Sequence, residues 1–350
     1  MRSYKPAVAF AATMISVVAA GCATSPSSTS NSSTSNSSTS NSSTASSSSA
    51  ASSSSTATAA SAAQGKLKSI FFANPLPTYP DWAIANTCFY SEAKKFGLSG
   101  ISQGPTGLTI DDQFVLNSIS QALAEKYSAM IVVPITPAEY EPLIQRAKSQ
   151  GMLVGTLNTG NSTTAQNFEI GTSYPVLGKD LAKDIGGRSG PQYLGLVTNG
   201  PGGIGATIFN AMEADLPSNV HVVATAYDQG NPSMTEDAVA QMLIAHPQIN
   251  VVYSWEGTAV AGISAAIKQQ NKVGKTVGVV NDLTSQVVAG IKDGTLYGTY
   301  EQHFCAMAKD AVDDFVAVSE GKPVPAQTDS GTTFVTAANL KQALATQNES

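Results

Sequence analysis

The sequence predicts an α/β protein whose folded part contains two parallel sheets. From Lys66 onward, short apolar runs alternate with amphipathic helical segments, the pattern of repeated strand–helix units. There are more strands than one sheet comfortably holds, so two sheets, each with its own core, are expected. Polar residues follow several of the apolar runs. Because open α/β sheets bind ligands at the carboxyl ends of their strands, these residues predict a binding crevice.

Composition limits the class of protein. The chain has 350 residues, a net charge of -6 and 42% hydrophobic residues, enough for two domains of ordinary size. Charged residues make up 13%, about half the usual share. The mild acidity and the lack of a Lys/Arg cluster argue against a nucleic-acid partner. Beyond the N-terminus, no apolar run is long enough to span a bilayer.

Residues 1–22 have the pattern of a lipoprotein signal peptide. Arg2 and Lys5 form a basic start, an apolar run covers 7–18, and small residues stand directly before Cys22. This end is similar to the bacterial lipobox, with Ala in place of the usual Leu three residues before the cysteine. The similarity implies that Cys22 is lipidated and anchors the mature chain to a membrane. The alternative is an ordinary secretory signal with an incidental cysteine.

Residues 23–64 are predicted to be a disordered tether. They consist almost entirely of Ser, Thr, Asn and Ala, with the motif NSST repeated from Asn31, Asn36 and Asn41. Such a segment has too little apolar surface to offset the entropy lost on ordering. At roughly 5–6 Å × √n, its root-mean-square reach is about 35–40 Å. That reach would hold a folded domain clear of a membrane surface.

The folded part divides into two series of elements. In the first, helices are expected at 80–97, 111–126 and 137–150, with strands at 69–72, 98–102, 129–133, 152–157 and 168–171. In the second, helices are expected at 174–186, 204–216, 232–246, 258–270 and 304–318, with strands at 193–197, 220–226, 251–254, 277–280, 296–300 and 332–335. A further helix carries Val287, Val288 and Ile291 on one face and stops at Asp293–Gly294.

Seven short strings stand out by their order and spacing; they lie at 71–82, 129–134, 157–159, 171–178, 242–253, 280–282 and 292–294. Taken together, they resemble the type I periplasmic sugar-binding proteins, the family of ribose- and galactose-binding proteins. The resemblance covers the region from about Lys66 to Val335, and the segment from Gly104 to Pro134 also resembles the autoinducer-2-binding branch.

The resemblance implies two flavodoxin-like, Rossmann-like lobes joined by a three-crossing hinge, the periplasmic binding protein type I fold. The crossings are expected near Thr172, Gln302 and Gln327. The domain would cover 65–345, with a first lobe of 66–172 plus 303–326 and a second of 173–302 plus 327–345. The last long helix would then return to the first lobe, beside the helix that begins at Pro80.

The same resemblance places the ligand in the cleft between the lobes. Asp282 matches the family's Asp after the penultimate strand, and Gln302 its hinge-side Gln. Asn158 and Thr159 stand where sugar binders often carry an Asp-Arg pair, so the usual charged partners are missing. The other expected ligand contacts are Asp81, Trp82, Tyr227, Trp255, Glu256 and Asn281. For Trp82 and Tyr227, packing in the core or between the lobes is the alternative, and for Asp81 it is helix capping.

Acidic side chains outnumber cations among these positions, which favours a neutral, hydroxyl-rich ligand such as a sugar or polyol, or one bearing an amine. The resemblance implies a monomeric solute-binding protein of an ABC importer, which works with a permease and an ATPase. It would stand on the extracellular or periplasmic side of a bacterial cell envelope and need no cofactor. A receptor of the autoinducer-2 type is the alternative among binding proteins.

The expected hinge also brings two cysteines together. Cys88 lies in the helix that begins near Pro80, and Cys305 at the start of the last long helix. If these helices are neighbours, as the resemblance implies, the cysteines could form a disulfide in an exported protein. Two separate buried thiols are the alternative.

Signals for an enzyme are weak. Residues 200–205, GPGGIG, fit the glycine pattern of a dinucleotide-binding turn, and Asp228 ends the next strand. Pro201 lies inside that turn, however, and an exported protein would not retain a nicotinamide cofactor. The three histidines, His221, His246 and His303, are scattered, and the cysteines lack metal-ligand spacing. A secreted NAD-dependent or carbohydrate-active enzyme remains the alternative of another class.

Overall fold

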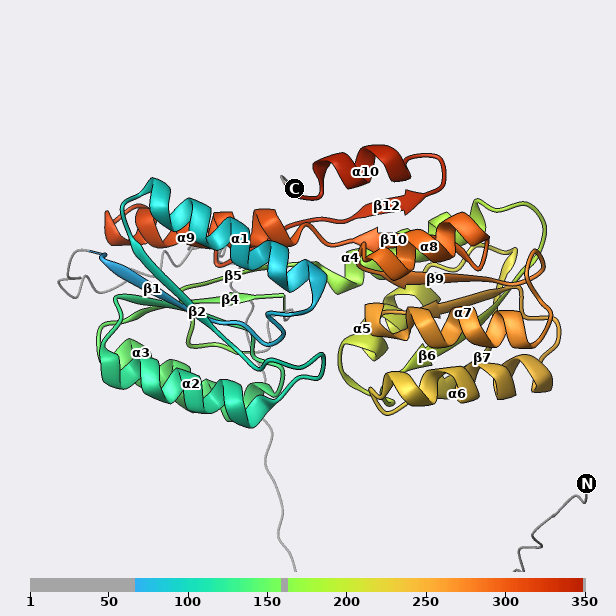
Figure 1. The fold of residues 1–350 in the computed structure, drawn as a ribbon, viewed down its shortest axis with the longest axis horizontal. Helices are drawn as coiled ribbons and strands as arrows, with labels where there is room; N and C mark the ends of the chain where they lie inside the picture. Colours follow the sequence, from blue (N-terminus) through green and yellow to red (C-terminus); the bar gives the residue numbers. More distant parts are fainter. Residues whose placement is uncertain (1–66, 159–162, 349–350) are drawn as a thin grey trace, which may run out of the picture. The chain divides into compact units, whose positions relative to one another are not determined.

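The computed structural model describes residues 67–158 and 163–348 of the chain. The expected signal segment with Cys22, the expected tether and Thr159 lie outside the described residues. Two six-stranded sheets form the folded part, each covered by helices on both faces (Figure 1). This confirms the predicted α/β fold class with two parallel-dominated sheets.

The first sheet is entirely parallel, with strand order β11-β5-β4-β3-β1-β2. Its strands are β1 (Ser69–Ala73), β2 (Ser99–Gln103), β3 (Ala129–Val132), β4 (Leu153–Leu157), β5 (Phe168–Gly171) and β11 (Gln327–Asp329). Side chains of α1 (Pro80–Lys95) and α9 (Phe304–Ser319) fill the core on one face. Those of α2 (Asp112–Glu125) and α3 (Pro137–Ser149) fill the other.

The second sheet has the order β12-β10-β9-β8-β6-β7, and only β12 runs antiparallel to its neighbour among the described strands. Its strands are β6 (Gln192–Thr198), β7 (Val220–Tyr227), β8 (Val251–Ser254), β9 (Val277–Asn281), β10 (Leu296–Glu301) and β12 (Thr333–Thr336). One face packs against α4 (Tyr174–Gly186) and α5 (Gly203–Glu213). The other packs against α6 (Pro232–Ala245), α7 (Val260–Gln269) and α8 (Ser285–Asp293).

Local sequence explains where these elements begin and end. The central strands are apolar runs whose residues are buried on both faces, as in β3 and β8. Proline occupies the first turn of α1, α3, α4 and α6, where its missing N–H costs no hydrogen bond. The side chain of Thr284 caps α8, and Gly294 ends that helix with a φ of 78°.

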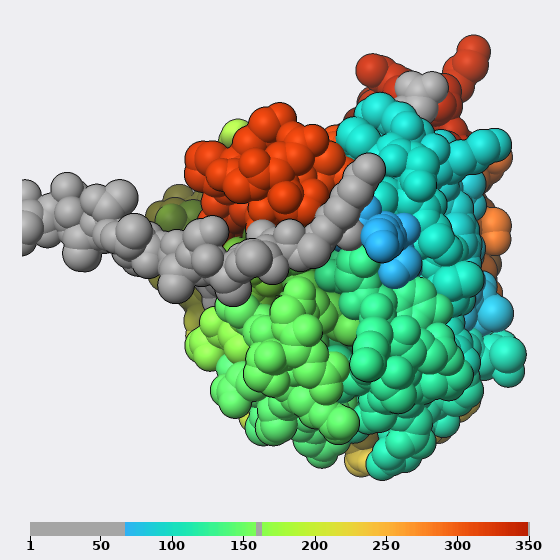
Figure 2. All heavy atoms as spheres, turned by 90° about the vertical axis from the view of Figure 1, so that its left-hand side faces the viewer, coloured from blue at the N-terminus to red at the C-terminus, as the bar shows by residue number. Residues whose placement is uncertain are grey.

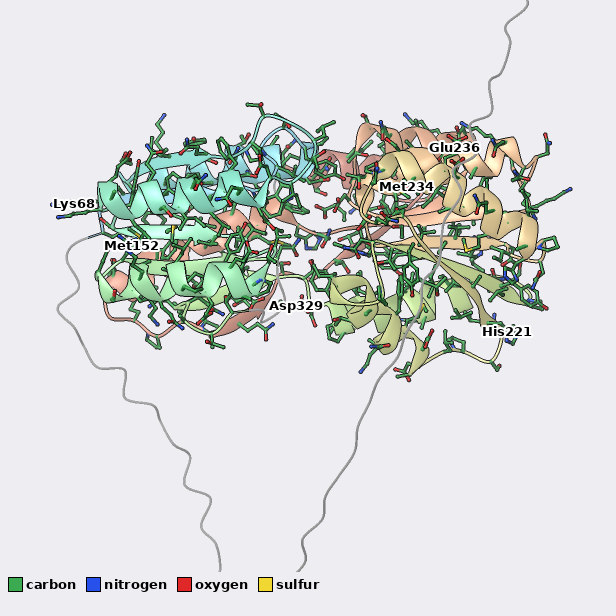
Figure 3. The ribbon with its side chains drawn as sticks, turned by 90° about the horizontal axis from the view of Figure 1, so that it is seen from below. Lys68, Met152, His221, Met234, Glu236 and Asp329 are labelled. Atoms are coloured by element: carbon green, nitrogen blue, oxygen red, sulfur yellow. A yellow bond between two sulfur atoms is a disulfide. The ribbon has the colours of Figure 1, made fainter. Side chains whose placement is uncertain are left out.

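Between the described sheets the chain crosses three times. It leaves the first sheet after β5, returns between β10 and α9, and leaves again between β11 and β12. The third crossing was expected near Gln327, but Gln327 belongs to β11 and pairs with Glu169 in the first sheet. The crossing therefore comes after Asp329. Figure 3 shows Asp329 at the junction, between Lys68 and Met152 on one side and His221 on the other.

Hydrogen bonds link the three crossing segments to one another. The hydroxyl of Thr172 donates to Gln302 Oε1 at 3.2 Å. The backbone N–H of Ser173 donates to Asp329 Oδ1 at 3.0 Å, and His303 Nδ1 lies 2.8 Å from the carbonyl oxygen of Ser330. Each crossing is thus bonded to another, so a change in one is transmitted to its neighbours.

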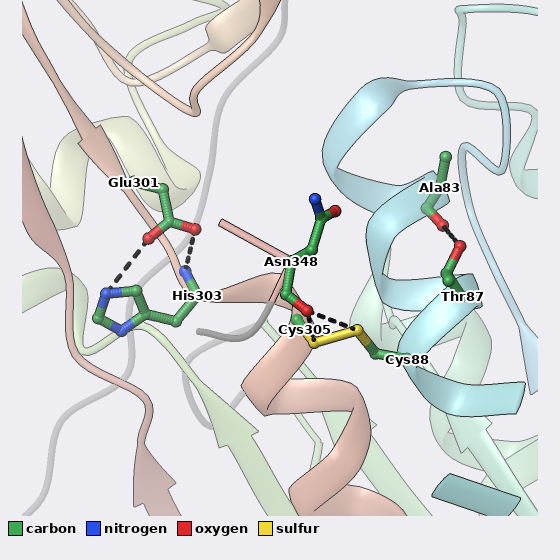
Figure 4. The surroundings of a disulfide bond; sticks show 7 residues. All are labelled: Ala83, Thr87, Cys88, Glu301, His303, Cys305 and Asn348. Carbon is green, nitrogen blue, oxygen red and sulfur yellow. Dashed lines mark hydrogen bonds and ion pairs between the residues drawn. A yellow bond between two sulfur atoms is a disulfide. The ribbon is translucent and has the colours of Figure 1, made fainter. Parts of the chain in front are cut away.

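A disulfide joins Cys88 of α1 to Cys305 of α9, with a Cα–Cα distance of 5.3 Å across 217 positions of sequence. Figure 2 shows α9 in orange-red against the cyan surface of the early chain, and Figure 4 shows the bridge itself. The structure thus pairs the two cysteines that the family resemblance placed on neighbouring helices. The carbonyl oxygen of Asn348 lies 3.1 Å from Cys305 Sγ.

The described chain continues past the expected domain end at residue 345. Helix α10 (Leu340–Thr346) is followed by Gln347, whose side-chain amide donates to Asp81 Oδ1 at 3.0 Å and to the carbonyl oxygen of Leu283 at 2.8 Å. Asp81 belongs to the first lobe and Leu283 to the second. The C-terminal segment therefore bonds to both lobes. Among the described residues, no helix has the length and apolar character needed to cross a membrane.

Candidate functional site

Asp282 is held in a defined position at the end of β9. Its backbone has a φ of 71°, a left-handed conformation that a residue other than glycine adopts at a cost. The N–H of Asp282 donates to the carbonyl oxygen of Tyr300 at 2.8 Å, and the carbonyl oxygen of Asp282 accepts a hydrogen bond from the hydroxyl of Thr299. These bonds to β10 offset that cost and fix the direction of the carboxylate.

Each oxygen of the Asp282 carboxylate accepts a hydrogen bond. Gln302 Nε2 donates to Oδ1 at 2.6 Å, and the hydroxyl of Tyr79 donates to Oδ2 at 2.8 Å. Tyr79 precedes α1 in the first lobe, Asp282 belongs to the second, and Gln302 lies in the second crossing. All three side chains are at least nine-tenths buried. This group, Tyr79, Asp282 and Gln302, is called the carboxylate cluster below.

Two further acids lie close to the carboxylate cluster. Asp81 is 1% exposed and Glu301 is 5% exposed. Burial raises the pKa of Asp81, and the charges of Asp282 and Glu301 raise it further. Burial also raises the pKa of Glu301, against the opposing charge of His303, whose Nε2 lies 3.2 Å from Glu301 Oε2 (Figure 4). Among the described residues, no hydrogen-bond donor meets Asp81 Oδ2.

Asn158 and Asn281 are fixed by tyrosine hydroxyls. Tyr174, at the start of α4, donates to the backbone oxygen of Asn158 at 3.0 Å or to its Oδ1 at 3.1 Å. Tyr253 donates to Asn281 Oδ1 at 3.1 Å, and no partner for Asn281 Nδ2 is found among the described residues. Tyrosine hydroxyls therefore hold both asparagines in place, and neither asparagine is hydrogen-bonded to Asp282 among the contacts described.

The aromatic residues expected at the ligand lie in different surroundings. Trp82 is 7% exposed and packs edge-on against Phe304 at 4.8 Å between ring centroids, inside the first-lobe core. Tyr227 is 49% exposed and borders a hollow of about 150 Å³ beside α5. Trp255 donates from Nε1 to the hydroxyl of Thr198 at 3.2 Å. Contact between these three rings and a ligand stays a prediction.

The sequence matches the periplasmic binding protein domain family over residues 70–323. The chain belongs to this family. The match spans strands and helices of both lobes, including Asp282 and Gln302. No curated protein sequence matches the chain.

Solved periplasmic binding proteins share the fold at low sequence identity. A glucose-galactose binding protein from Geobacillus stearothermophilus is 18% identical, with a TM-score of 0.73, over 79% of this chain and 99% of its own. A solute-binding protein from Burkholderia graminis in complex with D-arabinose is 20% identical, with a TM-score of 0.69, over 80% and 98%. One from Agrobacterium vitis bound to α-D-tagatopyranose is 15% identical, with a TM-score of 0.71, over 80% and 97%.

In this periplasmic binding protein, one glycine of the GPGGIG turn, Gly205, has a packing role. Gly205 lies against Trp255 and Thr198, where an added Cβ would come within 2.3 Å of the Thr198 hydroxyl oxygen. Asp228, which would contact the ribose if this were a dinucleotide site, accepts hydrogen bonds from the Thr235 hydroxyl at 2.8 Å and from the Gly230 N–H at 3.1 Å. These bonds build the turn before α6.

Glu256 lies beside this turn rather than in the carboxylate cluster. It follows β8 and is half-buried. Burial and the charge of Asp228 raise its pKa to about 7. Among the described residues, no group of three or more His, Cys, Asp or Glu side chains is arranged to hold a metal ion. A larger hollow, of about 570 Å³, is lined by residues between 105 and 114 and contains none of the expected site residues.

Tyr79 and Glu301 were not predicted as site residues. Tyr79 lies in a loop just before Pro80, and no local pattern distinguishes it from other loop aromatics. Glu301 had a usable signal, since it directly precedes Gln302 at the end of a strand. Polar residues at the carboxyl ends of buried strands found Asp282 and Gln302, and the same rule applied to Glu301 would have added it.

The buried carboxylates predict an unusual dependence of stability on pH. Burial raises the pKa of Asp282 to about 6, against the opposing hydrogen bonds from Tyr79 and Gln302. The folded protein therefore binds this proton more tightly than the unfolded chain does. The free energy of unfolding should fall by about 2 kcal/mol as the pH rises from 4 to 6, measured by urea unfolding.

Asp282→Asn provides the control, because its amide does not titrate. The difference in unfolding free energy between wild type and this variant should change across pH 4 to 6 and stay level from pH 7 to 8. Glu141 and Asp293 have lowered pKa values and act in the opposite direction in both proteins, so they cancel in the difference. A flat difference from pH 4 to 6 would contradict the raised pKa.

Proposed function

We propose that the protein is the solute-binding component of an ABC importer and captures a neutral, hydroxyl-rich ligand, a sugar or polyol. The observation that carries this is the carboxylate cluster, in which buried polar side chains from both lobes and a crossing meet at one carboxylate. In a protein that belongs to the periplasmic binding protein family, such a group at the carboxyl end of a strand is suited to ligand capture.

The chemistry of the cluster fits hydroxyl groups. A carboxylate accepts hydrogen bonds and an amide both donates and accepts, so together they match the paired donor and acceptor of a sugar hydroxyl. Asp81, Asp282 and Glu301 are buried close together, which disfavours an anionic ligand. The solved structures of this fold include proteins bound to D-arabinose and to α-D-tagatopyranose. The ligands of these proteins support a sugar as the first ligand class to test.

The mechanism follows from the three crossings. Rotation of the lobes about them would close the site on a ligand, and contacts made only in the closed form would shift the population toward that form. A permease would recognise the closed form, and an ATPase would drive transfer. No catalytic step is proposed for these residues.

We further propose that the mature chain is anchored through lipid on Cys22. The support is the sequence alone, an apolar segment that ends in small residues before a cysteine. The tether of 23–64 would then place the binding domain at the outer face of a bacterial membrane. Metabolic labelling with a fatty-acid analogue should mark the wild type and fail to mark Cys22→Ser.

A thermal-shift screen tests ligand capture. The probes are D-arabinose, D-galactose, D-glucose, D-tagatose and a set of polyols, each at several millimolar. A ligand present at 100 times its dissociation constant adds about 2.7 kcal/mol to the free energy of unfolding. We expect at least one probe to raise the melting temperature by several degrees. If no sugar or polyol shifts it, and amines or amino acids do, the proposed ligand class is wrong.

A further inference from the structure

The side chain of Tyr79 extends from the first lobe to a contact site in the second lobe, formed by Asp282 and Gly257. Its hydroxyl donates to Asp282 Oδ2 at 2.8 Å, and its side chain is buried. Gly257 is the first residue of the short 3-10 helix after β8. A Cβ at position 257 would lie 2.3 Å from the Tyr79 hydroxyl oxygen and 2.5 Å from Asp282 Oδ2. Position 257 therefore requires glycine.

The hydroxyl of Tyr79 occupies one of the two acceptor oxygens of Asp282, Oδ2. Oδ1 of Asp282 already accepts from Gln302, which leaves Oδ2 as the oxygen that faces the first lobe. We propose that Tyr79 sets the affinity and specificity of the site: its phenol competes with the ligand for Asp282, so that a ligand must offer a hydroxyl to displace it. This inference rests on the proposed function, since it concerns the same site.

The exchange is chemically balanced. A phenol and a sugar hydroxyl are both neutral donors, so replacing one with the other leaves the buried carboxylate with the same number of hydrogen bonds. Burial and the charges of Asp282 and Asp81 raise the pKa of Tyr79, which keeps its hydroxyl protonated as a donor. A ligand that lacks a hydroxyl at this point would leave Oδ2 without a donor in a buried site, which is costly.

The Tyr79 contact also holds the two lobes together. It joins the residue before α1 to the residue after β9, positions separated by 203 residues in sequence. A second bridge runs through Gln347, whose side-chain amide bonds to Asp81 in the first lobe and to Leu283 in the second. Removing the phenol hydroxyl would leave one of these two bridges, so the lobes should open more readily.

The test compares Tyr79→Phe with Tyr90→Phe in the full chain. Tyr90 is a matched control, because it lies on α1, is 44% exposed, and its hydroxyl accepts only the backbone N–H of Ser102 among the contacts described. Genetically encoded spin labels at Gln113 of α2 and Ser233 of α6, both exposed, report the distance between the lobes without disturbing Cys88 or Cys305.

In protein without added ligand, Tyr79→Phe should shift the distance distribution between the labels to longer values, and Tyr90→Phe should leave it as in wild type. With the probe that gives the largest thermal shift, calorimetry should show binding to Tyr79→Phe on the order of tenfold tighter. An unchanged distance distribution, or equal or weaker binding, would overturn the role of Tyr79. If no sugar or polyol binds wild type or variant, the proposed function fails, while the label distances still decide whether Tyr79 holds the lobes.

Discussion

Replacing Cys88 and Cys305 together with serine should lower the melting temperature by about 10 °C. The disulfide closes a loop of 217 positions, and the loss of chain entropy in the unfolded state on closing such a loop corresponds to roughly 3–5 kcal/mol of stability. For a domain of this size, each kcal/mol corresponds to about 2–3 °C. Scanning calorimetry of wild type and the double variant measures the difference.

Reduction of the wild type is the companion experiment. Dithiothreitol should lower the melting temperature of the wild type toward that of the double serine variant and leave the variant unchanged. The cysteines are 5% and 0% exposed, so reduction needs local opening and should be slow in the folded protein. Equal melting temperatures with and without the reductant would mean that the bond contributes no stability.

The disulfide also bears on the proposed site. Cys305 comes three residues after Gln302, and Cys88 lies on α1, the helix that follows Tyr79 and contains Asp81. The bond therefore ties the second crossing to the part of the first lobe that reaches Asp282. We expect the double serine variant to bind ligand more weakly as well as to melt earlier, because the residues of the carboxylate cluster lose a common support.

Asp282 and Gln302 could be expected from the sequence because their signal is local. Asp282 follows the largely apolar strand Val277–Asn281 and Gln302 follows the strand Leu296–Glu301, and the geometry of a parallel sheet then places both at one edge. Tyr79 has no such signal, since its partner is 203 residues away and the contact depends on how the lobes meet. Gly257 is similar: its need for glycine becomes visible only when Tyr79 is placed against it.

The third crossing was misplaced for a different reason. Strand β11 is three residues long, Gln-Thr-Asp, and its residues are mostly exposed, so neither an apolar run nor alternation marks it. It becomes a strand because β5 offers an unsatisfied edge at that point. Trp82 is a different case. An aromatic residue in a first helical turn fits a cleft or a core equally well; the ring packs against Phe304 of α9 in the first-lobe core, and its contact with a ligand stays a prediction.

Asp282→Ala should abolish ligand binding, with a loss of at least 100-fold in affinity in calorimetry with the best probe. The variant removes the acceptor at the centre of the carboxylate cluster and leaves the Tyr79 hydroxyl and the Gln302 amide buried without it. The ligand loses a hydrogen bond to a charged group, worth about 1.5–3 kcal/mol, and its hydroxyl is left in a buried site without a partner, which costs about 1–3 kcal/mol. Together these terms amount to about 2.5–6 kcal/mol, and about 2.7 kcal/mol corresponds to a 100-fold change in affinity.

Asp293→Ala is the matched control for this loss. Asp293 ends α8, the helix that follows Asp282, and its exposed carboxylate pairs with Lys268 at 2.7 Å. The exposed ion pair contributes at most about 1 kcal/mol, but Asp293 Oδ1 also accepts hydrogen bonds from the N–H and the hydroxyl of buried Thr295. This variant should therefore lose some stability and still bind the ligand normally. Full binding by Asp282→Ala would place the ligand elsewhere. In that case the carboxylate cluster would serve only to join the two lobes. Tyr79→Phe would then let the lobes open and would have no effect on the affinity for the ligand.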